Sequence, residues 1–135
     1  NYFIFYLKRG NRVATVDLTQ AEFDNTLTNN DIVLIDFWAE WCGPCRAFGP
    51  IFKAASEKYP DIVFAKVNTE EERDLAIRFG IRSIPTLMIY RENILIYSKP
   101  GALQAPGLED LIEQTKALDM NSVREEKARR EQAAA

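Results

Sequence analysis

The sequence predicts an α/β sandwich built around a mixed β-sheet. Short apolar runs of strand length alternate with stretches of helical periodicity. The run at 32–39 is apolar at nearly every position, as expected of a central parallel strand covered on both faces. Two later runs, at 85–90 and 94–98, are separated by only three polar residues, so they should pair antiparallel. Alternation followed by a hairpin and a closing helix gives a mixed sheet.

Length and composition indicate a single domain. Of the 135 residues, 47% are apolar and 27% charged, which is typical of a globular chain with one core. A formal net charge of −3 gives no electrostatic reason to expect a nucleic acid or an acidic membrane surface. No apolar run approaches the roughly 18 residues that a membrane span requires. We therefore expect neither nucleic acid nor membrane among the partners.

The first predicted helix begins at a capping-box pattern, in which Thr19 and Glu22 have the required spacing. It should end at the polar turn 29–31, and the buried strand 32–39 follows, with Asp36 interrupting its apolar run. After the cysteines, apolar residues at spacings of three and four predict a helix of about four turns. These residues are Cys45, Phe48, Phe52, Ala55 and Tyr59.

The second half continues with a strand at 62–67. Glu70 to Glu72 place negative charge at the start of a short helix, which suits the helix dipole, and Gly80 should end that helix. Pro85 opens a strand, where a missing N–H does least damage. A final amphipathic helix follows residues 106–107. Its apolar positions are Leu108, Leu111, Ile112, Thr115 and Leu118.

We divide the chain into an N-terminal extension (1–15), a central domain (16–119) and a charged tail (120–135). The head, NYFIFYL, is consistent with an added edge strand, a dimer contact or a segment foreign to the natural chain. Its apolar residues precede its basic ones, which is the wrong order for a signal peptide. The tail has no apolar stripe, so we expect a solvated helical extension or disorder.

The cysteines carry the functional signal. Cys42 and Cys45 are the only two in the chain, and histidine is absent. A structural zinc site needs four Cys or His ligands, and an iron–sulfur cluster needs more thiolates. A c-type haem site needs His directly after the second cysteine, where Arg46 stands. Disulfide-stapled secreted domains normally spread their cysteines along the chain. What remains is a dithiol that can open and close, which indicates redox chemistry and no metal.

The predicted elements assign different roles to the two thiols. A strand ends near Ala39 and a helix begins near Cys42, so the first thiol lies at the positive end of a helix, where a thiolate is favoured. Cys45 lies one turn further, on the buried stripe. From this difference in exposure we expect Cys42 to be the attacking nucleophile and Cys45 to resolve the mixed disulfide from inside.

The motif WCGPC after an apolar strand carrying Asp, followed about forty residues later by Ser-Ile-Pro-Thr, closely resembles the thioredoxin family. The similarity covers roughly residues 16–118. It implies the thioredoxin fold, a central mixed sheet flanked by helices on both faces, which agrees with the element order above. It also implies protein-disulfide reduction, in which two electrons and two protons pass from the dithiol to a substrate disulfide. No bound cofactor is implied.

The resemblance gives roles to three further residues. Asp36 matches the buried carboxylate that assists proton transfer at the resolving cysteine, and burial raises the pKa of such a group towards neutrality. The alternative is a carboxylate at the end of a strand that has no catalytic role and whose hydrogen bonds are made by capping. Lys66 matches the lysine that partners this carboxylate, although an exposed strand lysine is the usual case. Pro85 matches a cis-proline that faces the active site and frees the backbone of Ile84 to pair with an extended substrate.

The resemblance also implies an apolar docking surface around Cys42, formed by Trp41, Gly43, Pro44, Ile84, Gly101 and Ala102. We place Trp41 at the rim of the site and Trp38 in the core, together with Phe48, Phe52, Phe64 and Phe79. Ser83, Thr69 and Pro100 depart from the commonest family pattern. The departures bear on substrate preference and leave the reaction unchanged.

Two competing functions remain at this stage. A thiol oxidase or disulfide isomerase could use the same fold, but oxidising members usually carry a His between the cysteines and this chain has none. A redox-independent binding module would not need both thiols. We therefore expect a monomeric thioredoxin that contributes to cell redox homeostasis and electron transport. Its partners would be disulfide-containing clients and a thioredoxin reductase that draws on NADPH. With no export signal or structural disulfides, a cytoplasmic setting is expected.

Overall fold

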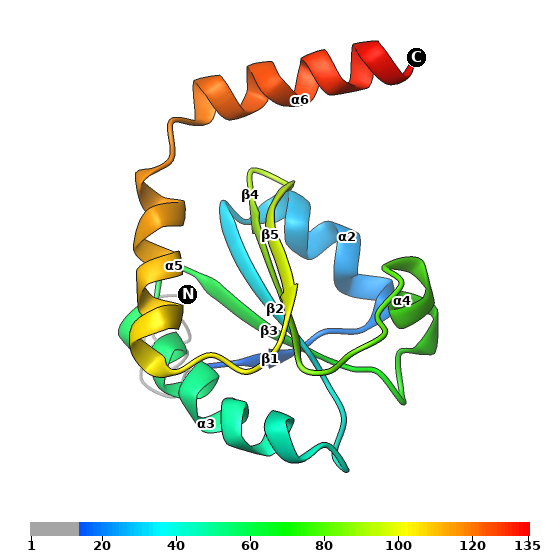
Figure 1. The fold of residues 1–135 in the computed structure, drawn as a ribbon, viewed down its shortest axis with the longest axis vertical. Helices are drawn as coiled ribbons and strands as arrows, with labels where there is room; N and C mark the ends of the chain where they lie inside the picture. The colour runs from blue at the N-terminus through cyan, green and yellow to red at the C-terminus, as the bar shows by residue number, and fades with distance from the viewer. Residues whose placement is uncertain (1–13) are drawn as a thin grey trace, which may run out of the picture.

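The computed structural model describes residues 14–135, which form a five-stranded sheet with helices packed on both faces (Figure 1). The strand order is β1-β3-β2-β4-β5. β1, β3 and β2 are parallel to one another, while β4 is antiparallel to β2 and β5 is antiparallel to β4. The strands are β1 (Val16–Asp17), β2 (Ile32–Trp38), β3 (Val63–Asn68), β4 (Thr86–Arg91) and β5 (Ile94–Pro100). The predicted mixed sheet is confirmed. The head, residues 1–13, lies outside the described residues.

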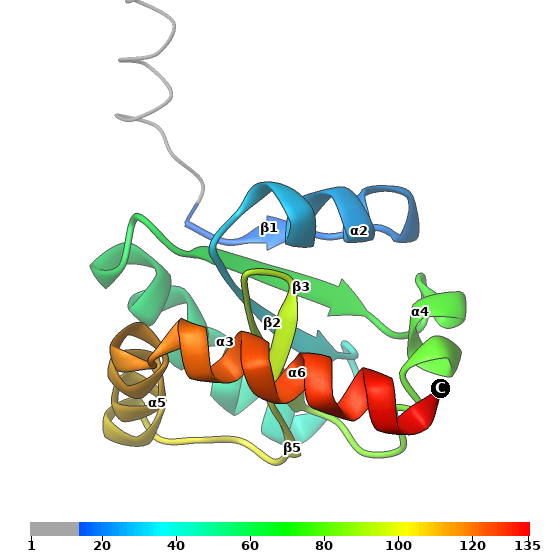
Figure 2. The ribbon, with the colours of Figure 1, turned by 90° about the horizontal axis from the view of Figure 1, so that it is seen from above.

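Helices lie on both sides of the sheet (Figure 2), and each face of the sheet has its own apolar core. One core joins the sheet to α3 and α5, and the other joins it to α2, with Leu75 of α4 at its edge. The helices are α2 (Gln20–Asn29), α3 (Gly43–Lys58), α4 (Arg73–Arg78), α5 (Ala105–Ala117) and α6 (Met120–Ala134). The helices predicted from apolar spacing are therefore present, and α3 continues through Pro50.

The central strand β2 divides its side chains between the two cores. Ile32 and Leu34 belong to the core under α3, whereas Val33 and Ile35 belong to the core under α2. Successive side chains of a strand point to opposite faces, so Asp36 falls on the face that α3 covers. The register of β2 therefore directs this carboxylate towards the cysteine-bearing helix.

Two helix starts differ from the sequence expectations. The side chain of Thr19 makes no capping hydrogen bond at α2, so the expected capping box is absent. Instead, Oε1 of Glu72 accepts a hydrogen bond from the backbone N–H of Gln20 at 2.9 Å. α4 begins at Arg73, after the acidic triplet, because that triplet forms the turn leaving β3. Gly80, with φ +60°, ends the helix as predicted.

The charged tail is helical. Met120 is buried at the start of α6, but almost every later side chain is exposed. Arg124 pairs with Glu92 in the β4–β5 turn. Arg91 at the end of β4 donates to the carbonyls of Thr115 and Lys116 at the end of α5, at 2.8 and 3.1 Å. The tail is therefore a solvated helix fixed at its base.

Candidate active site

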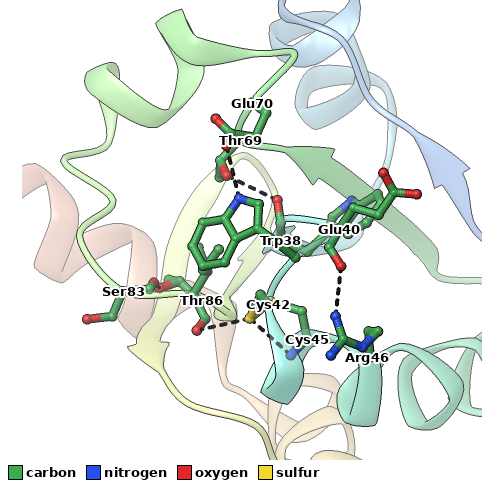
Figure 3. Close-up of a disulfide and its surroundings, with 11 residues drawn as sticks. Trp38, Glu40, Cys42, Cys45, Arg46, Thr69, Glu70, Ser83 and Thr86 are labelled. Carbon is green, nitrogen blue, oxygen red and sulfur yellow. Dashed lines mark hydrogen bonds between the residues drawn. A yellow bond between two sulfur atoms is a disulfide. The ribbon is translucent and has the colours of Figure 1, made fainter.

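The two cysteines form a disulfide at the start of α3 (Figure 3). Cys42 is the N-cap residue and Cys45 lies in the first turn, with their Cα atoms 5.2 Å apart. The N–H of Cys45 donates to Cys42 Sγ at 3.2 Å. A free N–H at a helix start stabilises negative charge, so the reduced form of Cys42 is placed where a thiolate is favoured.

One expectation about the thiols is wrong. We predicted an exposed Cys42 and a buried Cys45, but both side chains are 4% exposed. The disulfide ring folds the first sulfur against Ala39 and the second cysteine in one small apolar cluster, which Trp38 and Ile84 cover in part. Position at the helix start, and not exposure, therefore distinguishes the two thiols in this oxidised form.

Asp36 is fully buried, and neither carboxyl oxygen has a hydrogen-bond partner within residues 14–135. Burial raises the pKa of Asp36 to about 7, and the positive charge of Lys66 partly opposes that rise. A capping carboxylate would have backbone N–H partners, so the capping alternative does not describe this residue. A buried carboxyl group with a pKa near neutrality can accept and return a proton under cellular conditions.

Lys66 stands beside Asp36 on the neighbouring parallel strand, in direct register with it. Its Nζ lies 4.6 Å from the centre of the Trp38 ring, a cation–π distance. A methyl group at Gly49 would lie 3.8 Å from the same nitrogen, so α3 passes directly over it. Lys66 is half-buried and is not the exposed strand lysine of the alternative reading.

Lys66 and Trp38 also line a polar cavity of about 270 Å³. The remaining lining residues are Asp17, Leu18, Thr19, Glu40, Asn68, Glu71 and Glu72. The Nε1 of Trp38 is buried and has no hydrogen-bond partner among residues 14–135, and its ring is half-buried between this cavity and the cysteines.

The loop before β4 faces the disulfide from the other side. The Ile84–Pro85 peptide bond is cis, as the resemblance implied. The carbonyl oxygen of Ile84 lies 3.6 Å from Cys42 Sγ. The N–H of Gly101, a residue with φ +110°, donates to the carbonyl of Pro85 at 2.8 Å. This bond holds the end of β5 beside the same loop.

The remaining docking residues are exposed around these groups. Trp41 is 66% exposed, which places it at the rim of the site as expected. Gly43, Pro44 and Ala102 are also exposed. The structure therefore brings most of the predicted surface together at one end of the sheet, next to Cys42.

Sequence reasoning did not identify the groups that brace the cysteine loop. Thr69 donates to the carbonyl of Trp38 through its N–H and its hydroxyl, at 2.9 and 3.1 Å. The guanidinium of Arg46 donates to the carbonyl of Glu40 at 3.0 Å. Glu70 accepts a hydrogen bond from the indole of Trp41. Such contacts join distant segments, so no local pattern announces them.

Within residues 14–135, no helix is long and apolar enough to cross a membrane. The same residues hold no cluster of three or more Cys, Asp or Glu side chains placed to bind a metal ion.

Comparisons with known proteins agree with this site. A sequence model of the thioredoxin family matches residues 14–114. The putative thioredoxin 2 of Streptomyces coelicolor is 56% identical over 111 residues, covering 82% of this chain and 83% of that protein. The thioredoxin of Porphyra purpurea is 42% identical over 97 residues, covering 70% of this chain and 91% of that protein.

A solved structure extends the agreement to three dimensions. A mutant thioredoxin from Halobacterium salinarum superposes with a TM-score of 0.72 at 32% identity, covering 78% of this chain and 95% of that one. The disulfide between Cys42 and Cys45 is therefore the redox centre of a thioredoxin-type oxidoreductase. The chain belongs to the thioredoxin family and is a protein-disulfide reductase.

Proposed function

We propose that Cys42 is the attacking nucleophile and Cys45 the resolving thiol of this reductase. In the reduced protein, the Cys42 thiolate attacks one sulfur of a client disulfide. The client S–S bond breaks, a mixed disulfide forms at Cys42, and the first client sulfur leaves as a thiolate that takes up a proton. The position of Cys42 at the start of α3, where the N–H of Cys45 points at its sulfur, supports this assignment.

Asp36 then serves as the general base for the second step. It removes the proton from Cys45, whose thiolate attacks Sγ of Cys42. The mixed disulfide breaks, the second client thiol is released, and the Cys42–Cys45 disulfide forms. Two electrons have passed to the client, whose two sulfurs end as thiols. The pKa of about 7 that burial gives Asp36 suits this transfer near neutral pH.

Lys66 supports the proton transfer electrostatically. Its charge stabilises the ionised form of Asp36, which would otherwise be an uncompensated buried carboxylate. Lys66 also lines the polar cavity, and we propose that the transferred proton reaches solvent on that side.

The client is proposed to lie as an extended segment across the end of the sheet. The backbone of Ile84, presented next to the cis bond, would pair with it in the manner of β-augmentation. Trp41, Gly43 and Pro44 would flank it on one side, and Pro85, Gly101 and Ala102 on the other. Small and apolar side chains allow such a close approach.

The physiological setting follows from the reaction. A reductase that ends its cycle as a disulfide must be reduced again, and we propose a thioredoxin reductase that uses NADPH for this step. We further propose a cytoplasmic, monomeric protein that supplies electrons for redox homeostasis.

The single observation that supports the mechanism best is that Asp36 lies buried on the face covered by α3, the helix whose first turn carries both cysteines. A trapping experiment tests the roles. Cys45→Ser should accumulate clients as stable mixed disulfides on Cys42, detected by non-reducing electrophoresis, because the resolving step is blocked. Cys42→Ser is the matched control and should trap nothing. Equal trapping by both variants would contradict the assignment.

The reduction potential separates this function from the oxidase or isomerase alternative. Equilibration in thiol–disulfide buffers should give a reduction potential near the value typical of thioredoxin, about −270 mV. A reduction potential near that of protein disulfide isomerase, about −180 mV, would favour the oxidase or isomerase alternative.

A further inference from the structure

The indole of Trp41 is exposed but held in one position. This side chain stands directly before Cys42 and is 66% exposed. Its Nε1 donates to Oε1 of Glu70 at 2.9 Å. An exposed side chain usually samples several rotamers. A hydrogen bond to a carboxylate is stronger than one between neutral groups, so it can restrict the side chain to one rotamer. The bond therefore fixes a large apolar surface beside the attacking thiol.

Glu70 is itself fixed by the turn that follows β3 (Figure 3). The side-chain oxygen of Asn68 accepts hydrogen bonds from the N–H groups of Glu70 and Glu71, at 2.9 and 3.3 Å. The two bonds from Thr69 tie the same turn to the carbonyl of Trp38, the last residue of β2. The carboxylate that holds Trp41 is therefore anchored to the end of the sheet.

These contacts join two segments that are about thirty residues apart in sequence. The sequence separation of the Trp41–Glu70 bond is 29. The segment before Cys42 and the turn after β3 thus form one brace, and Trp41 is its outermost side chain. The mechanism above uses Trp41 for docking but gives no role to Glu70.

We propose that Glu70 is a positioning residue for client recognition, which acts by holding the Trp41 indole ready on the docking surface. This inference rests on the proposed docking role of Trp41. A side chain that is already ordered loses no rotational freedom when the client binds. Immobilising one side chain on binding changes affinity by about twofold to tenfold. Glu70 should therefore lower the KM for protein disulfides without changing the chemical steps at Cys42 and Cys45.

The test compares three variants. Glu70→Ala removes the acceptor. Glu70→Gln keeps an oxygen acceptor on a chain of the same length but removes the charge. Glu71→Ala removes one negative charge from the same turn without touching the bond to Trp41, so it is the matched control for charge and for local stability.

Single-turnover kinetics give the functional readout. The pre-reduced proteins are mixed with excess insulin as a protein disulfide, or with a small aromatic disulfide that reaches only the thiol. For Glu70→Ala we expect the half-saturating insulin concentration to rise about threefold to tenfold, the limiting rate to stay unchanged, and the small disulfide to react as before. The half-saturating concentration of Glu70→Gln should return most of the way to that of the unchanged protein. Glu71→Ala should have the same half-saturating concentration as the unchanged protein.

The indole N–H signal in ¹⁵N–¹H spectra gives an independent readout of the bond. The cross-peak of Trp41, assigned with Trp41→Phe, should move in Glu70→Ala and stay in place in Glu71→Ala. This signal does not depend on activity, so it separates loss of the bond from loss of function.

The possible results are distinct. A half-saturating concentration that is the same in Glu70→Ala and Glu71→Ala would overturn the inference, as would a lower limiting rate at an unchanged half-saturating concentration. A cross-peak that stays in place would also overturn it. Failure of the unchanged protein to reduce insulin, with the cross-peak moving as expected in Glu70→Ala, would overturn the proposed function and the inference that rests on it.

Discussion

At the scale of single residues, Asp36 is a buried ionisable group whose position costs stability, and its proposed role as general base would account for that cost. Its carboxyl group lies in the core under α3 with no hydrogen-bond partner in the part of the chain that the structure describes, and the charge of Lys66 partly offsets its burial. Core positions are normally apolar because a buried carboxylate is costly to ionise. The residue is therefore placed where stability alone would favour an apolar side chain.

The first prediction concerns Asp36→Asn. The pKa of Asp36 rises from 3.8 to about 7 on folding, so the folded state binds a proton more tightly than the unfolded state. The stabilisation from this proton is present below about pH 4 and is lost as pH rises to about 7. Asp36→Asn has no such loss. Between pH 4 and pH 8, its free energy of unfolding should therefore rise by roughly 4 kcal/mol relative to that of the unchanged protein. Urea unfolding across pH 4–8 measures the difference.

Asp24→Asn is the control for this prediction. Asp24 is an exposed carboxylate whose hydrogen bond to Arg78 lowers its pKa. Its contribution to stability is present above its unfolded pKa and is lost as pH falls through the lower folded value, which is the opposite sign. Parallel stability curves for Asp36→Asn and the unchanged protein would contradict the assignment of Asp36.

The same variant should also change the reaction. Without an ionisable group at position 36, resolution by Cys45 should slow about 10²-fold to 10⁴-fold near neutral pH, the usual contribution of a general base. Release of client from a preformed mixed disulfide, followed by rapid quench across pH 6–9, measures this step. An unchanged rate over that range would remove Asp36 from the mechanism.

The Cys42–Cys45 disulfide, the burial of Asp36 and the cis bond at Pro85 agree with the sequence expectations, and the roles of these residues stay predictions. The cysteine pair, Asp36 and Pro85 could all be identified from the motif that they form. The exposure of Cys42 could not, because it depends on how closely Ile84 approaches from a loop about forty residues away. The hydrogen bond between Trp41 and Glu70 could not be predicted for the same reason.

At the scale of elements, long-range contacts replace local signals at helix ends. The sequence predicted a capping box at Thr19, but the carboxylate of Glu72 takes that place at the start of α2. The helix itself is present as predicted, and its buried residues Phe23 and Leu27 have the spacing of four that places them on one face. Element type therefore follows from periodicity, whereas the groups that cap each end follow from the tertiary fold.

Glu72→Ala tests this cap. The free N–H of Gln20 would lose its protein acceptor, and we expect a loss of about 1 kcal/mol in the free energy of unfolding. Glu72→Gln keeps an acceptor and should recover part of that loss. Glu71→Ala should leave stability nearly unchanged, because the N–H of Gln20 donates to the carboxylate of Glu72 and not to that of Glu71. A similar loss in both alanine variants would show that charge, and not the hydrogen bond, is responsible.

At the scale of the whole molecule, two apolar cores and one sheet account for residues 16–118. The antiparallel pairing of the last two strands could be predicted because only a short polar turn joins them. The path of α6 could not, since a helix without an apolar stripe carries no signal for where it packs. Its base is set by Met120 and by the pair of Arg124 with Glu92.

Ending the chain after Ser122 tests whether the central domain is complete without the tail. The shortened protein keeps Met120 and loses mainly one exposed ion pair and half-buried Val123. We expect its free energy of unfolding to fall by no more than about 1–2 kcal/mol, and its reduction potential to stay unchanged. Arg124→Ala in the full chain isolates the ion pair. A much larger loss of stability would mean that the tail belongs to the domain.

The position of α6 has a practical consequence. β4 runs from the loop at Pro85 to the turn that α6 contacts, so the disulfide and the C-terminal helix lie at opposite ends of the same strand (Figure 1). A strand of this length separates them by roughly 20 Å. If the protein is anchored to an electrode or a bead through its last residues, the thiol pair should face the solution. Immobilised protein could then be reduced, loaded with partners and washed in repeated cycles.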